Sequence, residues 1–375
     1  MYGHHREPNL PTVESSGKVW HVSARFALII FFLISCCIPA RAGANFDLVS
    51  APGGIILTQV GNNYIASFGT MNALGIGAPA AGVTVIPLSN GSLYLTSYAL
   101  FVHGGLAAGQ TGFVTAYAST NFAHPIALVL QSCPSSSSCN ASNQFSNLST
   151  NVGAQTTVIA PPGIVKGATV NAGLAIFVPD NNGGNAFNGT DQAVISFTMI
   201  NNNTGATIET LTLSLNNPRE TLQSAVSLTL ASATGGLSIA PSTDYAMNFG
   251  NVNGLGFGPG AGLAVSATAG GVIYSTPYLL RPAFSDQSST TATLKTFVST
   301  NFAHPAVLGL RDAASSTGPF TPIGNSPGGA VVISTTAANR STLTRFLGLF
   351  VSNANGATAF AGSDAATLTF TMTVP

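Results

Sequence analysis

Charged side chains are scarce in this 375-residue chain. They make up 6% of the residues, and 11 Lys and Arg balance 11 Asp and Glu. Soluble domains ordinarily carry about 25% charged residues. No basic run or face is present to neutralise phosphates or anionic lipid, which argues against a nucleic-acid partner. The shortage of Glu, Lys and Arg also disfavours helices, because these residues normally cover the wet face of a soluble helix.

Groups that perform catalysis are equally sparse. Beyond residue 42 the chain has three histidines, His103, His124 and His304, and no nucleophile elbow precedes a helix. The glycine-rich stretch 254–262 has neither the G-x-G-x-x-G frame nor the Lys-Ser/Thr pair of a phosphate loop. No His, Cys or carboxylate set has the spacing of metal ligands. We therefore predict a non-enzymatic protein without cofactor or metal.

A single long apolar run, FALIIFFLISCCIP, occupies residues 26–39. It is too short to span a bilayer as a helix, and an Ala-x-Ala site follows it. This pattern predicts an export signal over residues 1–42, cleaved between Ala42 and Gly43. The four residues ending at Cys36 also resemble a bacterial lipobox, which would attach a lipid to Cys36. A secreted or cell-surface protein, a lipoprotein and a retained anchor all remain open, and no transmembrane span is expected after cleavage.

The heptapeptide STNFAHP occurs twice, at residues 119–125 and 299–305. The flanking sequence also matches. FGTMNALGIG at residues 68–77 aligns with FGNVNGLGFG at 249–258, and GTDQAVISFTM at 189–199 aligns with GSDAATLTFTM at 362–372. A repeat this long indicates tandem domains rather than a solenoid. We predict one repeat over residues 43–203 and a second over residues 221–375.

Two features distinguish the predicted repeats. The first contains Cys133-Pro-Ser-Ser-Ser-Ser-Cys139, whereas the second has no cysteine. In an exported chain this spacing predicts a local disulfide between Cys133 and Cys139. The linker, residues 204–220, has no counterpart after the second repeat. Alternating Leu211, Leu213 and Leu215 predict an extra strand within it.

Apolar residues alternate with Thr and Ser through most of the chain, and Asn- and Gly-rich turns separate these segments. Short alternating strands without a helical period indicate an all-β fold. We predict two tandem Ig-like antiparallel β-sandwich domains, each large enough to bury its own core.

The STNFAHP loops connect two predicted strands. In the structural interpretation, Phe122 and Phe302 plug the loop and each imidazole satisfies a buried carbonyl. In the alternative, His124 and His304 contact a metal or ligand. Asp191 and Asp364, at matching positions, are interpreted as turn residues that open the final strand. Matched tyrosines also have two interpretations, as core residues or as contacts for a glycan, and these are Tyr94, Tyr98, Tyr274 and Tyr278.

The endings GTDQAVISFTM and GSDAATLTFTMTVP, and Phe-Gly at residues 68–69 and 249–250, resemble bacterial fimbrial and spore-coat-U-type subunits. Those subunits are secreted Ig-like sandwiches that polymerise by lending a strand to a neighbour. The resemblance implies a surface or fibre role. The second repeat departs from it, because the cysteine pair expected in many such subunits is missing there.

Together these observations predict an exported, non-enzymatic structural or adhesive protein of the cell surface that assembles by strand exchange. A second repeat without its own extra strand would expose a sheet edge, and open edges recruit strands from other chains. We expect the partner to be a second copy or another surface subunit, with the donor strand supplied by a neighbour's segment beginning at Gly43. A carbohydrate- or surface-ligand-binding module is the alternative, and a secreted hydrolase is the least favoured.

Overall fold

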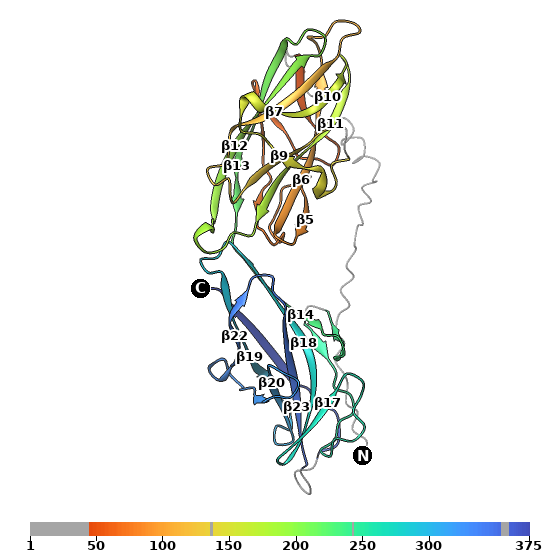
Figure 1. The fold of residues 1–375 in the computed structure, drawn as a ribbon, viewed down its shortest axis with the longest axis vertical. Helices are drawn as coiled ribbons and strands as arrows, with labels where there is room; N and C mark the ends of the chain where they lie inside the picture. The colour runs from red at the N-terminus through yellow and green to blue at the C-terminus, as the bar shows by residue number, and fades with distance from the viewer. Residues whose placement is uncertain (1–44, 136–137, 242–243, 354–359) are drawn as a thin grey trace, which may run out of the picture. The chain divides into compact units, whose positions relative to one another are not determined.

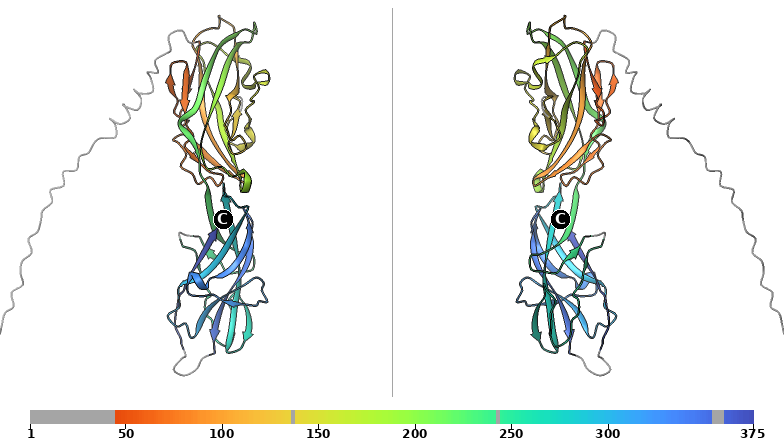
Figure 2. Two further views of the ribbon diagram at one scale, coloured as in Figure 1. Left: turned by 90° about the vertical axis from the view of Figure 1, so that its left-hand side faces the viewer. Right: turned by 90° about the vertical axis from the view of Figure 1, so that its right-hand side faces the viewer.

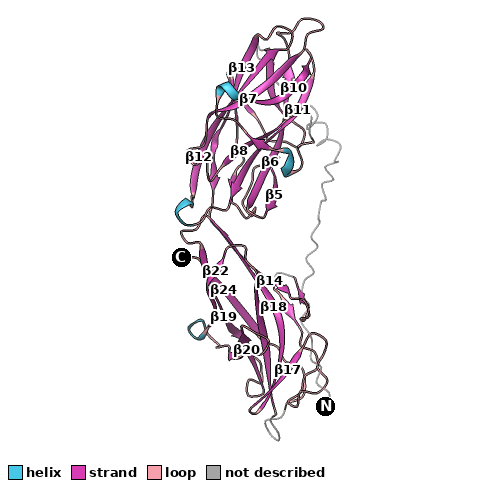
Figure 3. Ribbon diagram, viewed as in Figure 1, coloured by secondary structure: helices cyan, strands magenta, loops and turns pink. Residues whose placement is uncertain are grey.

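The computed structural model describes residues 45–135, 138–241, 244–353 and 360–375. Strands dominate these residues (Figure 3), and the described part of the chain contains short 3-10 turns but no α-helix. The predicted all-β class with antiparallel sheets is confirmed. The predicted signal segment, its cleavage site at Ala42 and the lipid site at Cys36 lie outside the described residues. Among the residues described, none belongs to a helix long and apolar enough to cross a membrane.

The first half, residues 45–222, contains two sheets (Figure 1). One has the order β1 (Phe46–Ser50), β6 (Gly91–Val102), β11 (Thr169–Pro179), β8 (Val129–Cys133) and β9 (Ser146–Asn147), with β5 (Thr84–Leu88) on β6. The other has the order β10 (Thr156–Ile164), β7 (Gly112–Thr120), β12 (Gly189–Asn201), β13 (Thr207–Leu222), β3 (Asn63–Ala66) and β2 (Thr58–Val60), with β4 (Thr70–Met71) on β13. Short 3-10 turns lie at η1 (Ser142–Gln144), η2 (Val152–Ala154) and η3 (Gly183–Asn185).

The second half, residues 225–375, contains one sheet of similar order and one that is much smaller. The larger sheet runs β14 (Ala225–Ser232), β18 (Gly271–Ser285), β23 (Leu343–Ser352), β20 (Leu308–Ala313) and β21 (Thr321–Pro322), with β17 (Ala264–Thr268) on β18. The smaller sheet has three strands, β22 (Val331–Ala338), β19 (Thr291–Thr300) and β24 (Thr367–Thr373). A separate pair, β15 (Ile239–Ala240) and β16 (Ala246–Met247), and the turn η4 (Pro327–Gly329) complete this half.

Period-two alternation places the apolar side chains of the first half in one core. On β12, Ile195, Phe197 and Met199 are buried, while Val194 and Thr198 on the other face are partly exposed. The ring of Phe197 meets the edge of Tyr98 on β6 at 5.6 Å between centroids, which joins the two sheets. Because successive side chains of a strand point to opposite faces, the alternation in the sequence specifies which side chains face this core.

The strand predicted between the repeats is β13, and it completes the core of the first half. It pairs antiparallel with β12 and parallel with β3, and it can be followed beside β12 in Figures 1 and 2. Its leucines Leu211, Leu213 and Leu215 are fully buried. Residues 223–224 alone separate β13 from β14. This strand therefore belongs structurally to the half that precedes it.

The predicted disulfide between Cys133 and Cys139 is confirmed, with a Cα–Cα distance of 5.7 Å. It begins at the last residue of β8 and closes the connection toward η1. The sulfur of Cys139 packs over Gly173 of β11, where an added Cβ would lie 3.0 Å from that sulfur and 2.8 Å from the Cβ of Cys139. The absence of a side chain at Gly173 thus allows the cystine to pack onto the sheet.

Candidate functional site: an open groove beside β24

The outer edge of β24 distinguishes the second half from the first. Among the described residues, β24 pairs with β19 alone. The matching strand of the first half, β12, has β7 on one edge and β13 on the other. The backbone N–H and C=O groups along the free edge of β24 are therefore available to a further strand.

The side chains of β24 are correspondingly less buried than their counterparts. Ile195, Phe197 and Met199 of β12 are at most 1% exposed. At the matching positions of β24, Leu368, Phe370 and Met372 are all partly exposed. The same apolar pattern thus lacks the cover that β13 supplies in the first half.

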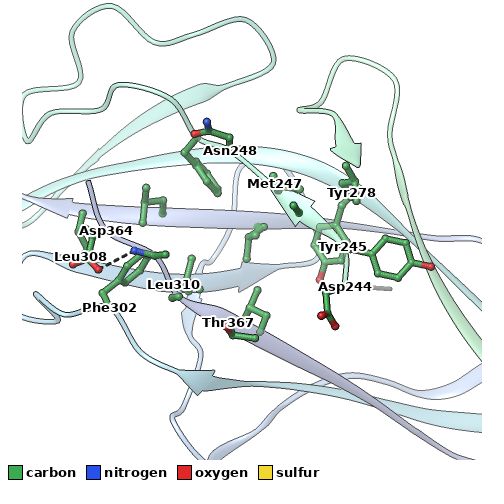
Figure 4. A pocket seen from close by; sticks show the side chains of 18 of the residues that line it. Asp244, Tyr245, Met247, Asn248, Tyr278, Phe302, Leu308, Leu310, Asp364 and Thr367 are labelled. Atoms are coloured by element: carbon green, nitrogen blue, oxygen red, sulfur yellow. Dashed lines mark hydrogen bonds between the residues drawn. The ribbon is translucent and has the colours of Figure 1, made fainter. Parts of the chain in front are cut away.

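A groove of about 870 Å³ occupies this uncovered space (Figure 4). Figure 4 shows Tyr278, Leu310, Leu308 and Phe302 lining it, with Thr367 on the β24 side. Its apolar lining comes from both sheets and from the segment around β16, and includes Leu228, Leu230, Met247, Phe249, Leu347, Leu349, Leu368 and Phe370. Polar side chains also line it, among them Asp244, Asn248, Asp364 and Thr367, so the groove combines core-type apolar residues with polar ones.

The floor of the groove is neutral. The Tyr278 hydroxyl donates to Asp312 at 3.2 Å, and Asp312 is ion-paired with Arg345. Burial, reinforced by the Asp312 carboxylate, raises the pKa of Tyr278 well above its ordinary value and keeps the phenol protonated. Asp312 is therefore neutralised by the Arg345 guanidinium, and the protonated ring of Tyr278 offers no nucleophile.

The STNFAHP loops are held by the aspartates of the matched endings. Asp191 Oδ2 lies 3.0 Å from Nδ1 of His124 and accepts from its backbone N–H, while Oδ1 accepts from the N–H of Ala123. The second copy repeats these contacts between Asp364 and the loop at His304, where the Nδ1 distance is 2.9 Å. Each carboxylate therefore joins the loop to the start of the final strand.

An aromatic ring also contacts each histidine, and we call each set of aspartate, loop and ring contacts a clamp. His124 stacks on Phe187 at 3.7 Å between centroids, and His304 stacks on Phe360 at 3.8 Å. The backbone N–H of Ala303, helped by donors on His304 and Ala365, lowers the pKa of Asp364 to about 2. For Asp191, burial raises the pKa, but three backbone N–H groups and His124 outweigh it and lower the net value. Both carboxylates are thus stabilised in the charged form.

These clamps correct the interpretation of the loop. The partner of each imidazole is a carboxylate, not the buried carbonyl that the sequence suggested, and Asp191 and Asp364 bind the loop as well as opening the final strand. The sequence contained a signal for this, because Phe187 and Asp191 have the same spacing as Phe360 and Asp364. Phe122 is buried as expected of a plug, whereas Phe302 is partly exposed and lines the groove.

The remaining sequence candidates do not form a polar binding site. His124 and His304 are half-exposed, and within the described residues no group of three His, Cys, Asp or Glu side chains is placed to hold a metal. The four matched tyrosines are at most 2% exposed, as the core interpretation expects, and of the four Tyr278 lines the groove. The Tyr94 hydroxyl bonds both backbone groups of Asn72, and Tyr274 does the same at Asn253.

No family model and no curated protein matches the chain. Solved structures similar to it include the CupB6 tip adhesin of Pseudomonas aeruginosa, at 8% identity and a TM-score of 0.27 over 88% of this chain and 94% of that one. The CooA pilin subunit of enterotoxigenic Escherichia coli matches at 12% identity and 0.26, over 48% and 99%. A chaperone–tip adhesin complex of CFA/I fimbriae biogenesis matches at 12% and 0.23, over 88% and 84%. These neighbours are fimbrial adhesin and pilin subunits, and at such scores they carry no argument about activity.

Proposed function

We propose that this chain is an exported, non-enzymatic structural or adhesive protein of the cell surface, built from two duplicated Ig-like β-sandwich domains. Its second domain accepts a β-strand from another polypeptide. The observation that carries this proposal is the contrast between β12, covered by β13, and β24, whose free edge borders an apolar groove. The export signal over residues 1–42 is part of the same proposal.

A strand fits this site better than a small molecule does. The edge of β24 supplies a ladder of backbone donors and acceptors, and the groove beside it supplies apolar contacts for alternate side chains. Within the first half, β13 meets both demands by running antiparallel to β12 and burying three alternating leucines. The expected donor therefore runs antiparallel to β24 and carries apolar residues at every second position.

We propose a donor other than the segment beginning at Gly43 that the sequence suggested. The chain from Phe46 onward is committed to β1, which pairs with β6 of its own sheet. The N–H groups of Asn45 and Phe46 also donate to Glu209 of β13. A chain cleaved after Ala42 has only residues 43–45 ahead of β1, too few to cover the seven residues of β24. The donor comes from another region of a second copy or from another surface subunit.

The test uses a peptide with the sequence of residues 207–215, TIETLTLSL, added to the purified chain that begins at Gly43. The same peptide with its three leucines changed to serine is the matched control. We expect the leucine peptide to protect the amides of β24 from hydrogen exchange and to dissociate multimers detected by light scattering. A chain that is monomeric at all concentrations and that binds neither peptide refutes the strand-acceptor proposal.

A further inference from the structure

Two turns meet where the first half contacts the second. One follows β11 and spans residues 180–187, and the other follows β18 at residues 286–288. The N–H of Asp286 donates to the carbonyl of Asn181 at 2.9 Å, and the N–H of Gly183 donates to the carbonyl of Gln287 at 2.8 Å. The side chain of Asn182 adds a bond to the N–H of Gln287 at 3.1 Å. The two turns are thus connected mainly through their backbones.

A buried carboxyl group lies within this contact. Asp286 is 5% exposed, and its Oδ1 accepts from the N–H of Phe187 at 3.5 Å. Its Oδ2 is buried and has no hydrogen-bond partner among the described residues. Its φ of 54° lies in the left-handed region, which Asp and Asn tolerate better than other non-glycine residues. An ionised carboxylate without a partner for one oxygen is costly in such a place.

The charged groups around Asp286 do not compensate its charge. Arg340, in the turn between β22 and β23, is ion-paired with Asp180 and also donates to the carbonyls of Ala73 and Leu88. Asp180 itself adds a repulsive charge. The imidazole of His124 stacks on the ring of Phe187, whose N–H donates to Asp286. Burial raises the pKa of Asp286 to about 7; the Phe187 N–H and the Ser285 side chain oppose this shift, and the Asp180 charge adds to it.

We propose that Asp286 is a proton-operated latch between the two halves, which holds the turns together when its carboxyl is protonated and loosens them when it ionises. Protonation removes the unpaired charge and lets the neutral carboxyl remain buried against Phe187. Ionisation favours the separated turns, where water reaches Oδ2. The closed contact has the same backbone hydrogen bonds whether Asp286 is protonated or ionised, so the proton alone shifts the balance between closed and separated turns.

The direction of the pH effect follows from linkage. Asp286 binds its proton more tightly in the closed contact, where its pKa is about 7, than in the open one, where the ordinary value of 3.8 applies. The equilibrium constant for closing is therefore highest below about pH 4, falls roughly tenfold per pH unit up to about pH 7, and is constant above that. Between pH 5 and pH 7 the opening equilibrium rises by up to about a hundredfold.

Amide hydrogen exchange of the chain that begins at Gly43 measures this opening at Gly183, Asp286 and Gln287. After correction for intrinsic rates, we expect their protection to fall by up to about a hundredfold from pH 5 to pH 7 and to level off above. Asp286→Asn, which keeps the shape and suits the left-handed φ, is expected to abolish the dependence. His124→Gln, which removes the stacked imidazole, should leave it intact.

The carboxyl carbon resonance of Asp286 provides a second readout that does not depend on the stability of any variant. It should titrate near pH 7 instead of near pH 4. A titration near 4, or a protection profile that Asp286→Asn leaves unchanged, overturns the latch. These outcomes are independent of strand binding at β24, because the latch residues do not line the groove.

Discussion

Phe197 and Phe370 allow one substitution to be compared at two matched positions, one covered and one open. Each ring packs against a buried tyrosine of the opposite sheet, Tyr98 at 5.6 Å and Tyr278 at 5.8 Å between centroids. Phe197 is 1% exposed on a strand that pairs with β13, whereas Phe370 is partly exposed to the groove. Removing a fully buried Phe costs about 3–5 kcal/mol. With part of its surface already wet, we expect Phe370→Ala to cost about half as much.

A difference of about 2 kcal/mol corresponds to roughly thirtyfold in the local unfolding constant. Hydrogen exchange in increasing urea, resolved by peptides from β12 and from β24, measures both values in one chain. Filling the groove with the TIETLTLSL peptide should raise the cost of Phe370→Ala toward that of Phe197→Ala. Equal costs in the uncomplexed monomer would refute the reasoning, because they would mean that β24 is covered as fully as β12.

Three other expectations follow from named contacts. Appending residues 202–215 after Thr373 should supply the missing strand in the same chain, protect the amides of β24 from exchange and suppress association. A version with its three leucines changed to serine is the control. Unchanged association would speak against strand acceptance. The stability that the Asp191 and Asp364 carboxylates contribute is complete above the ordinary pKa of 3.8 and is lost as pH falls through their lowered folded-state pKa values. Asp191→Asn and Asp364→Asn should therefore each reduce the fall in unfolding free energy between pH 4 and pH 2. Reducing the Cys133–Cys139 disulfide should lower the unfolding free energy of the first half by roughly 2 kcal/mol and leave the second half unchanged, as urea unfolding with and without reductant will show.

The open edge of the second half could be anticipated from the sequence, whereas the groove beside it and the donor strand could not. The leucine alternation of residues 211–215 occurs once, and that asymmetry pointed to an uncovered edge in the second half. The sequence suggested the segment after Gly43 as the donor, because nothing local in FDLVS shows which strand it pairs with. Pairing with β6 is a contact between residues about fifty positions apart, and only the assembled sheet shows it.

The sequence by itself determined the strand class, the matched stretches and the disulfide, because period-two alternation, repetition and cysteine spacing are local properties. Only the tertiary structure decided that Asp191 clamps His124 and that Tyr94 and Tyr98 are buried. It also decided that β13 pairs with β12, while no strand among the described residues pairs with the outer edge of β24. Each of these depends on which distant strand lies beside which. The alternation of a strand says which side chains share a face, but not what packs against that face.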